Sequence, residues 1–225
     1  MVKKLSNIIE RIVDRTGLKR LISPKVGGLC GVLGPIIGLT FIGAAIYFAP
    51  WFSWTDNYLS DLAGDVGERP IWSALGKESL IFNFGLIVAG IMGIVFAANI
   101  REIPMLDTPL GRLGTLLFFL DMVALCAVGI FPKTTGSPHA VASVSFFLLV
   151  PLYLLFIGTV VRRSPEKTLG WFITLLGVIA LCLAPLFVIP RPWGSNAIAE
   201  MFPAILMAVF AMVFGTRLLK GKFEF

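Results

Sequence analysis

Six long stretches of the sequence carry almost no charged side chains, and this feature constrains the fold more than any other. A helix needs about 20 mainly apolar residues to cross the hydrocarbon core of a bilayer. Each stretch is close to that length, so we expect an all-α, polytopic integral membrane protein built as a six-helix transmembrane bundle. The expected spans cover residues 26–50, 79–100, 113–131, 140–161, 169–190 and 196–216.

Composition excludes the main alternatives to a membrane protein. Hydrophobic residues make up 57% of the 225 residues and charged residues only 14%, whereas a soluble domain carries about 25% charged residues. A disordered chain would carry more charge and fewer aromatic side chains than the 19 Phe present. We expect one transmembrane domain, residues 26–225, and no large soluble domain.

Residues 1–25 form a separate basic segment ahead of the first span. Its apolar residues recur at helical spacing, and Lys and Arg fall between them. This pattern is typical of an amphipathic helix that lies on an anionic membrane surface. A frayed cytoplasmic tail is the alternative. The apolar positions are Leu5, Ile8, Ile9, Ile12 and Val13.

The basic residues predict the orientation of the bundle. Of the 19 Lys and Arg residues, 15 lie before the first span, after the last one, or in the second-to-third and fourth-to-fifth connections. Positive charge collects on the cytoplasmic side of membrane proteins. We therefore expect a multi-pass protein of the cell membrane with both termini cytoplasmic, and we do not read the net charge of +6 as a sign of nucleic-acid binding.

Rows of small residues indicate close helix packing. Gly27 and Gly31, and Gly34 and Gly38, are four residues apart, as are Gly85, Ala89 and Gly93 in turn. Such rows let helix backbones approach each other. They pack helices within one bundle more often than between chains, so an oligomer formed through them stays open.

No metal or cofactor is expected. The three cysteines, Cys30, Cys126 and Cys182, lie inside apolar spans without zinc-type spacing. The single histidine, His139, excludes a bis-histidine haem site and a three-histidine zinc site. The sequence also lacks the nucleophile-elbow, phosphate-loop and metalloprotease motifs.

Polar residues gather in the first outer loop. The loop reads Trp51-Phe-Ser-Trp-Thr-Asp-Asn-Tyr-Leu-Ser-Asp-Leu62. Trp54 suits the membrane interface, and Ser53 or Thr55 is expected to cap a short helix. On that helix Asp56 lies one turn before Ser60, and Asn57 one turn before Asp61.

Further polar residues are expected at the same membrane level. Lys133 and His139 belong to the second outer loop and the start of the fourth span, where Ser137 fits an N-cap and Pro138 the first helical position. Asn83 and Glu200 lie about one turn inside the second and sixth spans.

Polar residues at membrane depth are costly and usually functional, so these residues define a candidate site for a lipid or polyisoprenoid headgroup at the outer leaflet. In an enzyme, His139 would be the general base, and Asp56 or Asp61 would orient it or hold a cation. The expected substrate-binding residues are Asn57, Ser60, Asn83, Trp54, Lys133 and Glu200.

Two other functions stay open. In a non-catalytic lipid-binding or scaffold protein, the same residues would only cap helices and fix the loops. In a transporter or channel, Asp121 near mid-bilayer would lie on the path. Asp121 can act in a proton relay or in a buried hydrogen bond, and Tyr153 and Thr40 are expected at similar depths.

Four segments resemble a known family. They are the first outer loop, Phe82-Asn-Phe-Gly-Leu86, Gly129-Ile-Phe-Pro132 and Ser137-Pro-His139. Together they resemble domain-of-unknown-function family 998, prokaryotic and archaeal six-helix membrane proteins, over roughly residues 28–190. That family is loosely similar to the superfamily of the FGF-receptor-activating protein and the damage-regulated autophagy modulator, some members of which act in lipid remodelling. The resemblance implies the six-helix fold and an intact outer-loop motif, but no reaction.

Overall fold

The computed structural model describes residues 21–64, 76–187, 189 and 194–223. Six long helices in this part are long and apolar enough to cross a membrane, as the sequence predicts. They are α2 (Pro24–Phe48), α3 (Lys77–Arg101), α4 (Pro109–Ile130), α5 (Ser137–Val161), α6 (Lys167–Leu183) and α7 (Ala197–Leu219). Short 3₁₀ helices connect or extend them: η2 (Leu59–Ala63), η3 (Pro104–Leu106), η4 (Lys133–Thr135) and η5 (Ala184–Phe187).

Helix starts follow from local side-chain chemistry. Ser23 caps α2, because its hydroxyl accepts from the backbone N–H of Val26 at 3.2 Å, and Pro24 occupies the first turn where no amide donor is needed. Thr108 and Pro109 repeat this arrangement at the start of α4. The side chain of Asn99 on α3 then holds the entry to α2, accepting from Ser23 N at 2.7 Å and donating to the Leu21 carbonyl at 2.8 Å.

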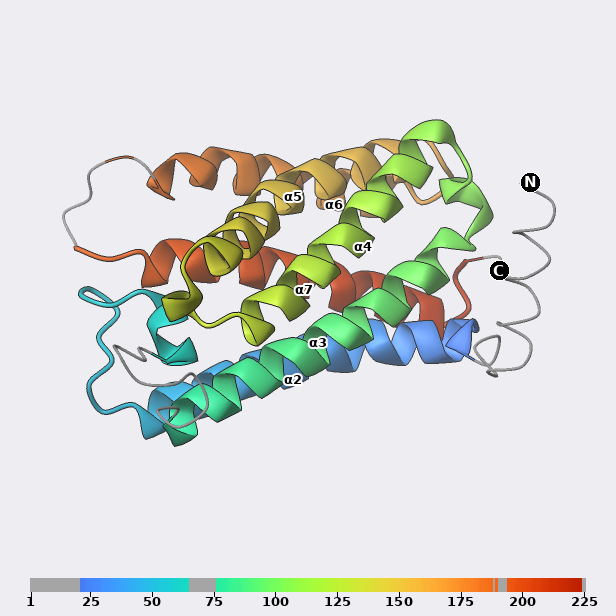
Figure 1. The fold of residues 1–225 in the computed structure, drawn as a ribbon. Coiled ribbons are helices and arrows are strands. Elements are labelled where there is room, and N and C mark those ends of the chain that lie inside the picture. Colours follow the sequence, from blue (N-terminus) through green and yellow to red (C-terminus); the bar gives the residue numbers. More distant parts are fainter. Residues whose placement is uncertain (1–20, 65–75, 188, 190–193, 224–225) are drawn as a thin grey trace, which may run out of the picture.

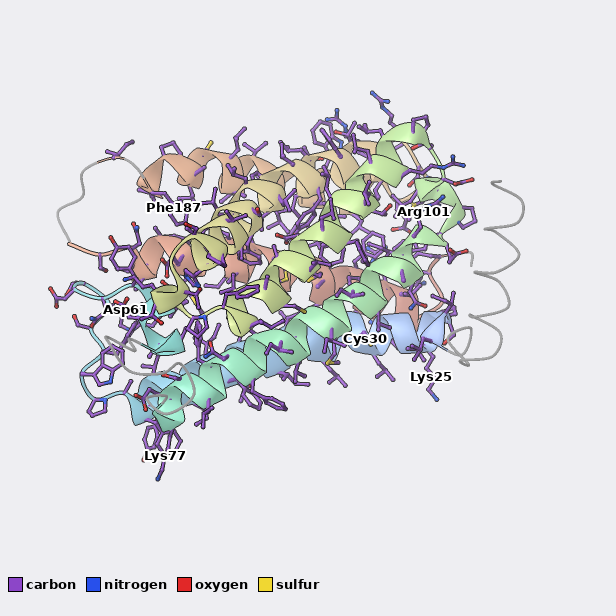
Figure 2. The ribbon with its side chains drawn as sticks, viewed as in Figure 1. Lys25, Cys30, Asp61, Lys77, Arg101 and Phe187 are labelled. Carbon is purple, nitrogen blue, oxygen red and sulfur yellow. The ribbon has the colours of Figure 1, made fainter. Side chains whose placement is uncertain are left out.

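The helices run alternately up and down, so that α2 begins and α7 ends at the same end of the bundle (Figure 1). Neighbours in sequence from α2 to α6 pack side by side, and α7 packs mainly on α2 and only lightly on α5 and α6. We call the end that holds η2 and η4 the loop end, and the opposite end the terminus end. Figure 2 shows Asp61 and Lys77 at the loop end, and Lys25 and Arg101 at the terminus end.

Aromatic side chains fill the middle of the bundle. Phe118 of α4 contacts Phe96 of α3, Tyr153 of α5 and Phe210 of α7, with ring centroids 4.9–5.8 Å apart. All four side chains are fully buried.

Large apolar side chains on the outward faces stay exposed, among them Leu80, Phe84, Val141, Leu148 and Trp171. An exposed apolar surface on every helix is stable only against lipid, and the chain is a multi-pass membrane protein.

The rows of small residues lie at helix contacts. A Cβ added at Gly34 or Gly38 of α2 would lie 3.1–3.2 Å from a Cβ of α3, and one added at Gly31 would meet the ring of Phe96. The α2–α3 contact is therefore close because these positions lack a side chain.

Three local expectations differ from the structure or fall outside it. The predicted basic helix at residues 1–25 lies mostly outside the described residues. The first outer loop forms a turn at residues 54–57 and a 3₁₀ helix that begins only at Leu59, so the short helix capped by Ser53 or Thr55 is wrong. Ser137 is the first residue of α5 and not its N-cap, because Gly136 takes that place with a positive φ of 71°.

Candidate functional site

The 3₁₀ helix η2 is fixed to the second loop by one carboxylate. Asp61 accepts from the backbone N–H of Tyr58 at 2.7 Å and pairs with Lys133 of η4. The ammonium of Lys133 also lies 4.0 Å from the centre of the Tyr58 ring, a cation–π contact. Asp61 and Lys133, both predicted site residues, thus lie together at the loop end.

Asp56 is bonded within its own turn. Its carboxylate accepts from the hydroxyls of Ser53 at 2.5 Å and Thr55 at 3.1 Å, and these two bonds lower the pKa of Asp56 below its ordinary value. Asn57 closes the same turn, since its Oδ1 accepts from Ser53 N at 2.8 Å. Neither residue is bonded to His139.

Three further bonds join the first loop to α3, to α7 and to Ser195, two residues before α7. Asn83 of α3 donates to the carbonyl of Ala63 at 2.9 Å, and Ser195 donates to the carbonyl of Trp54 at 2.9 Å. Glu200, in the first turn of α7, accepts from the backbone N–H of Ser60 at 3.2 Å. These bonds place Asn83, Trp54, Ser60 and Glu200 at the loop end.

His139 lies in the first turn of α5 and is buried, with an exposed fraction of 6%. Its Nδ1 lies 2.8 Å from the carbonyl oxygen of Phe131, and its Nε2 lies 3.1 Å from the hydroxyl of Ser143, one turn later on α5. Both ring nitrogens therefore have partners that are not carboxylates, the Phe131 carbonyl and the Ser143 hydroxyl. The expected orienting role of Asp56 or Asp61 stays a prediction.

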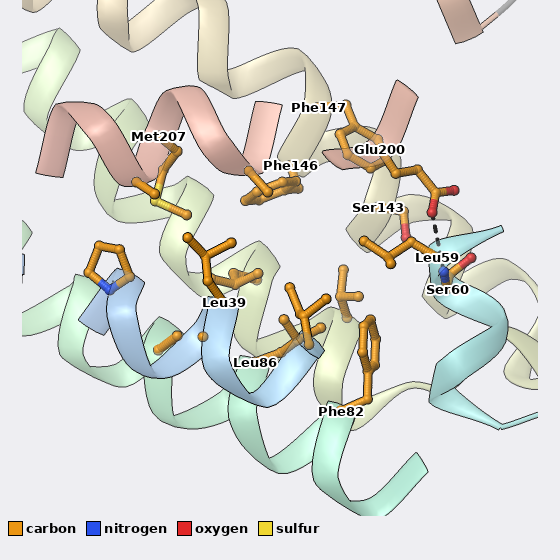
Figure 3. A pocket seen from close by; sticks show the side chains of 18 residues that line it. Leu39, Leu59, Ser60, Phe82, Leu86, Ser143, Phe146, Phe147, Glu200 and Met207 are labelled. Carbon is orange, nitrogen blue, oxygen red and sulfur yellow. Dashed lines mark hydrogen bonds between the residues drawn. The ribbon is translucent and has the colours of Figure 1, made fainter. Parts of the chain in front are cut away.

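A pocket runs from the loop end into the bundle between α2, α3, α4, α5 and α7 (Figure 3). Its cavity volume is about 80 Å³. Only three lining side chains are polar, Ser60, Ser143 and Glu200, and Figure 3 shows them together at one end, with Met207 toward the other. The apolar lining includes Leu39, Leu59, Phe82, Leu86, Phe146 and Phe147.

A second, deeper cavity adjoins this pocket. The two share Pro35, Ala89, Leu125 and Met207, and the deeper one reaches the Phe96 and Phe118 rings and Ala211. From Glu200 to Ala211 the path along α7 covers eleven residues, which is about 16 Å of helix. The two cavities therefore share an apolar wall, and the polar side chains Ser60, Ser143 and Glu200 line only the outer one.

Asp121 and Tyr153 lie apart from this site. Both are fully buried near the middle of the bundle. Within the described residues, neither carboxyl oxygen of Asp121 nor the Tyr153 hydroxyl has a hydrogen-bond partner. The buried hydrogen bond, one of the two roles considered for Asp121, is therefore not formed, and a role in proton transfer stays a prediction.

Ser143 and the apolar pocket were not predicted from the sequence. Ser143 follows His139 by four residues on one helix, and this spacing alone could have marked the pair. The pocket lining gives no comparable signal, because its residues have the same composition as those that face lipid. Among the described residues, no group of three acidic, histidine or cysteine side chains could hold a metal ion.

The fold and this site define a class: a six-helix polytopic membrane protein with a largely apolar pocket whose polar side chains lie at the loop end. The family model described as "Protein of unknown function (DUF998)" matches residues 32–217, and the chain belongs to this family. No curated protein and no solved structure matches the chain.

Proposed function

We propose that this protein binds a membrane lipid in the pocket of α2, α3, α4, α5 and α7. The hydrocarbon chain lies along α7, and the polar group of the lipid lies against Ser60, Ser143 and Glu200. The observation that carries the proposal is the single polar end of an otherwise apolar cavity, because a lipid has the same one-ended polarity.

The lining also limits the polar group. No Lys or Arg lines the pocket, and the ammonium of Lys133 is already paired with Asp61. A phosphate at this depth would find no cation, whereas hydroxyl, amine or ester groups would find two hydroxyls and a carboxylate. We expect the ligand to place such a group here and any phosphate farther out.

Entry is from the bilayer, between α5 and α7. These two helices pack on each other only lightly. The distribution of Lys and Arg supports a loop end that faces outward at the cell membrane, so the lipid would come from the outer leaflet.

Lipid that co-purifies with the protein tests the proposal. The detergent-purified wild type, Ala204→Trp and Ile205→Trp are compared by lipid extraction and mass spectrometry. Ala204 lines the pocket, whereas the side chain of Ile205 is 41% exposed on the outer face of the same helix. We expect at least a tenfold loss of bound lipid in Ala204→Trp and none in Ile205→Trp.

A second measurement covers the case in which Ala204→Trp does not fold. The wild type is irradiated with a photoactivatable fatty acyl lipid or a photoactivatable polyprenol, in separate samples, and the attachment sites are mapped. Attachment at Leu39, Phe147 or Met207 supports the proposal, and the sample that labels identifies the lipid class. Attachment spread evenly over the exposed residues of all six helices would overturn it.

A further inference from the structure

Ser143 and His139 form a hydroxyl–imidazole pair on the wall of the pocket. The two residues are one turn apart on α5, and Ser143 Oγ lies 3.1 Å from His139 Nε2. Ser143 lines the pocket beside Ser60 and Glu200 (Figure 3). The hydroxyl is therefore open to a bound lipid, while the imidazole behind it is buried.

The backbone determines which nitrogen of His139 carries the proton. A carbonyl oxygen only accepts hydrogen bonds, so Nδ1, 2.8 Å from the Phe131 oxygen, is the protonated nitrogen of the neutral imidazole. Nε2 is then an acceptor, and the hydroxyl of Ser143 donates to it. This is the arrangement by which an imidazole activates a serine hydroxyl, with a backbone carbonyl in place of the usual carboxylate.

We propose that Ser143 is a nucleophile and His139 its general base, and that the pair transfers the acyl group of an ester-linked lipid. This inference rests on the proposed function, because the pocket must bind the acyl chain for the ester to reach Ser143. A chain that lies along the apolar walls places its ester group at the polar end, where Ser60, Ser143 and Glu200 lie.

The reaction balances without an added oxidant or metal. Ser143 Oγ bonds to the ester carbonyl carbon as its proton passes to His139 Nε2. The bond from that carbon to the alcohol oxygen then breaks, and Nε2 returns the proton to the departing alcohol. Water, or a second alcohol, then attacks the acyl carbon while Nε2 takes its proton. The bond from that carbon to Ser143 Oγ breaks and Nε2 returns the proton to Oγ, which releases the acid or a new ester and restores both side chains.

Ser60 is the candidate donor to the oxyanion that forms on the ester carbonyl. Its side chain lies at the same end of the pocket, on a helix that the bond to Glu200 and the Asp61–Lys133 pair hold in place. A donor in a site with little water stabilises developing negative charge more than it would in solution.

Covalent labelling with a long-chain alkyl fluorophosphonate, followed by peptide mapping, tests the proposal. The wild type should be labelled at Ser143, and Ser143→Ala should not be labelled. His139→Gln should react at least about 100-fold more slowly than the wild type, since a positioned base contributes 10²–10⁴-fold. Ser145→Ala is the matched control on the same helix and should react like the wild type, because Ser145 does not line the pocket.

A further pair of variants tests the same proposal if Ser143→Ala does not fold. Ser143→Cys should react with a long-chain iodoacetamide at least tenfold faster than Ser145→Cys, and His139→Gln should abolish the difference. Equal rates for the two cysteines would overturn the proposal, as would a wild type that is not labelled at Ser143.

Failure of this inference can be distinguished from failure of the proposed function. If the wild type carries lipid but shows neither labelling nor ester cleavage, acyl transfer is wrong and lipid binding stands. If Ala204→Trp and the wild type carry the same lipid, the pocket proposal fails and this inference falls with it.

Discussion

The backbone N–H of Ser60 donates a hydrogen bond to Oε2 of Glu200, and this bond joins residues 140 positions apart. It connects η2 to the first turn of α7, a helix that packs mainly on α2. The polar end of the pocket therefore depends on one buried acceptor.

Replacement of Glu200 should loosen the loop end. Glu200→Ala leaves the Ser60 amide without its partner, and we expect a loss of about 1–3 kcal/mol in unfolding free energy. Glu200→Gln keeps an acceptor oxygen and should lose less. Thermal melting in detergent measures both, with Glu102→Ala at the exposed terminus end as control. A Glu200→Ala protein that melts like the wild type would contradict the connection.

Asp61 should matter more for stability than its partner Lys133. An exposed ion pair contributes only about 0–1 kcal/mol, and the Lys133 side chain is 42% exposed. Asp61 also caps η2 by accepting from Tyr58 N, a bond worth about 0.5–2 kcal/mol. Asp61→Ala should therefore lower the melting temperature more than Lys133→Ala, and only the ion-pair share should weaken with added salt. Equal losses in the two variants would mean that the cap contributes nothing.

The turn around Asp56 should loosen in acid. The hydroxyls of Ser53 and Thr55 lower the pKa of Asp56 in the folded protein. Its bonds thus stabilise the turn fully above the ordinary Asp pKa of about 3.9 and are lost as pH falls through the lower folded pKa. Carboxyl-carbon NMR, assigned with Asp56→Asn, should give a midpoint below 3.9, and Ser53→Ala should raise it. Thr134→Ala, in the other loop, should leave it unchanged.

Two glycines should respond oppositely to a larger side chain. A Cβ at Gly90 would meet Cys126 Sγ and lie 3.0 Å from the Met122 carbonyl oxygen, whereas a Cβ at Gly43 would find nothing within 4 Å. Gly90→Leu should cost about 1–3 kcal/mol through overpacking. Gly43→Leu should be neutral or gain up to about 1 kcal/mol, because glycine is a poor helix former. Equal melting temperatures would show that α3 and α4 can separate at little cost.

The helical spans could be predicted because the length of an uncharged run maps directly onto bilayer thickness. Their ends differ by a few residues, since caps such as Thr108 start a helix before its charge-free part. The place of Asn83 and Glu200 near the loop end was also predictable, because each lies close to the start of a helix that begins there.

The residues that line the site were harder to predict from the sequence. The pocket depends on how five helices rotate about their axes, and Met207 in the pocket cannot be told from lipid-facing Phe202 by sequence. His139 could be identified as a candidate from its residue type. Its partner could not, because His139 contacts the backbone carbonyl of Phe131 and not a side chain. A charged side chain among apolar residues indicates a site, yet Asp56 bonds only within its own turn.

The orientation of the bundle is open to direct labelling. Thr134 lies in η4 at the loop end, and Ser164 lies between α5 and α6 at the terminus end. The loop end carries few of the 19 Lys and Arg residues, so we expect it to face outward. In a background without Cys30, Cys126 and Cys182, Thr134→Cys should react with a membrane-impermeant maleimide on intact cells. Ser164→Cys should react only after permeabilisation, which is also the control that both thiols are reachable. Reaction of Ser164→Cys alone on intact cells would show that the bundle has the opposite orientation. The pocket would then take its lipid from the cytoplasmic leaflet.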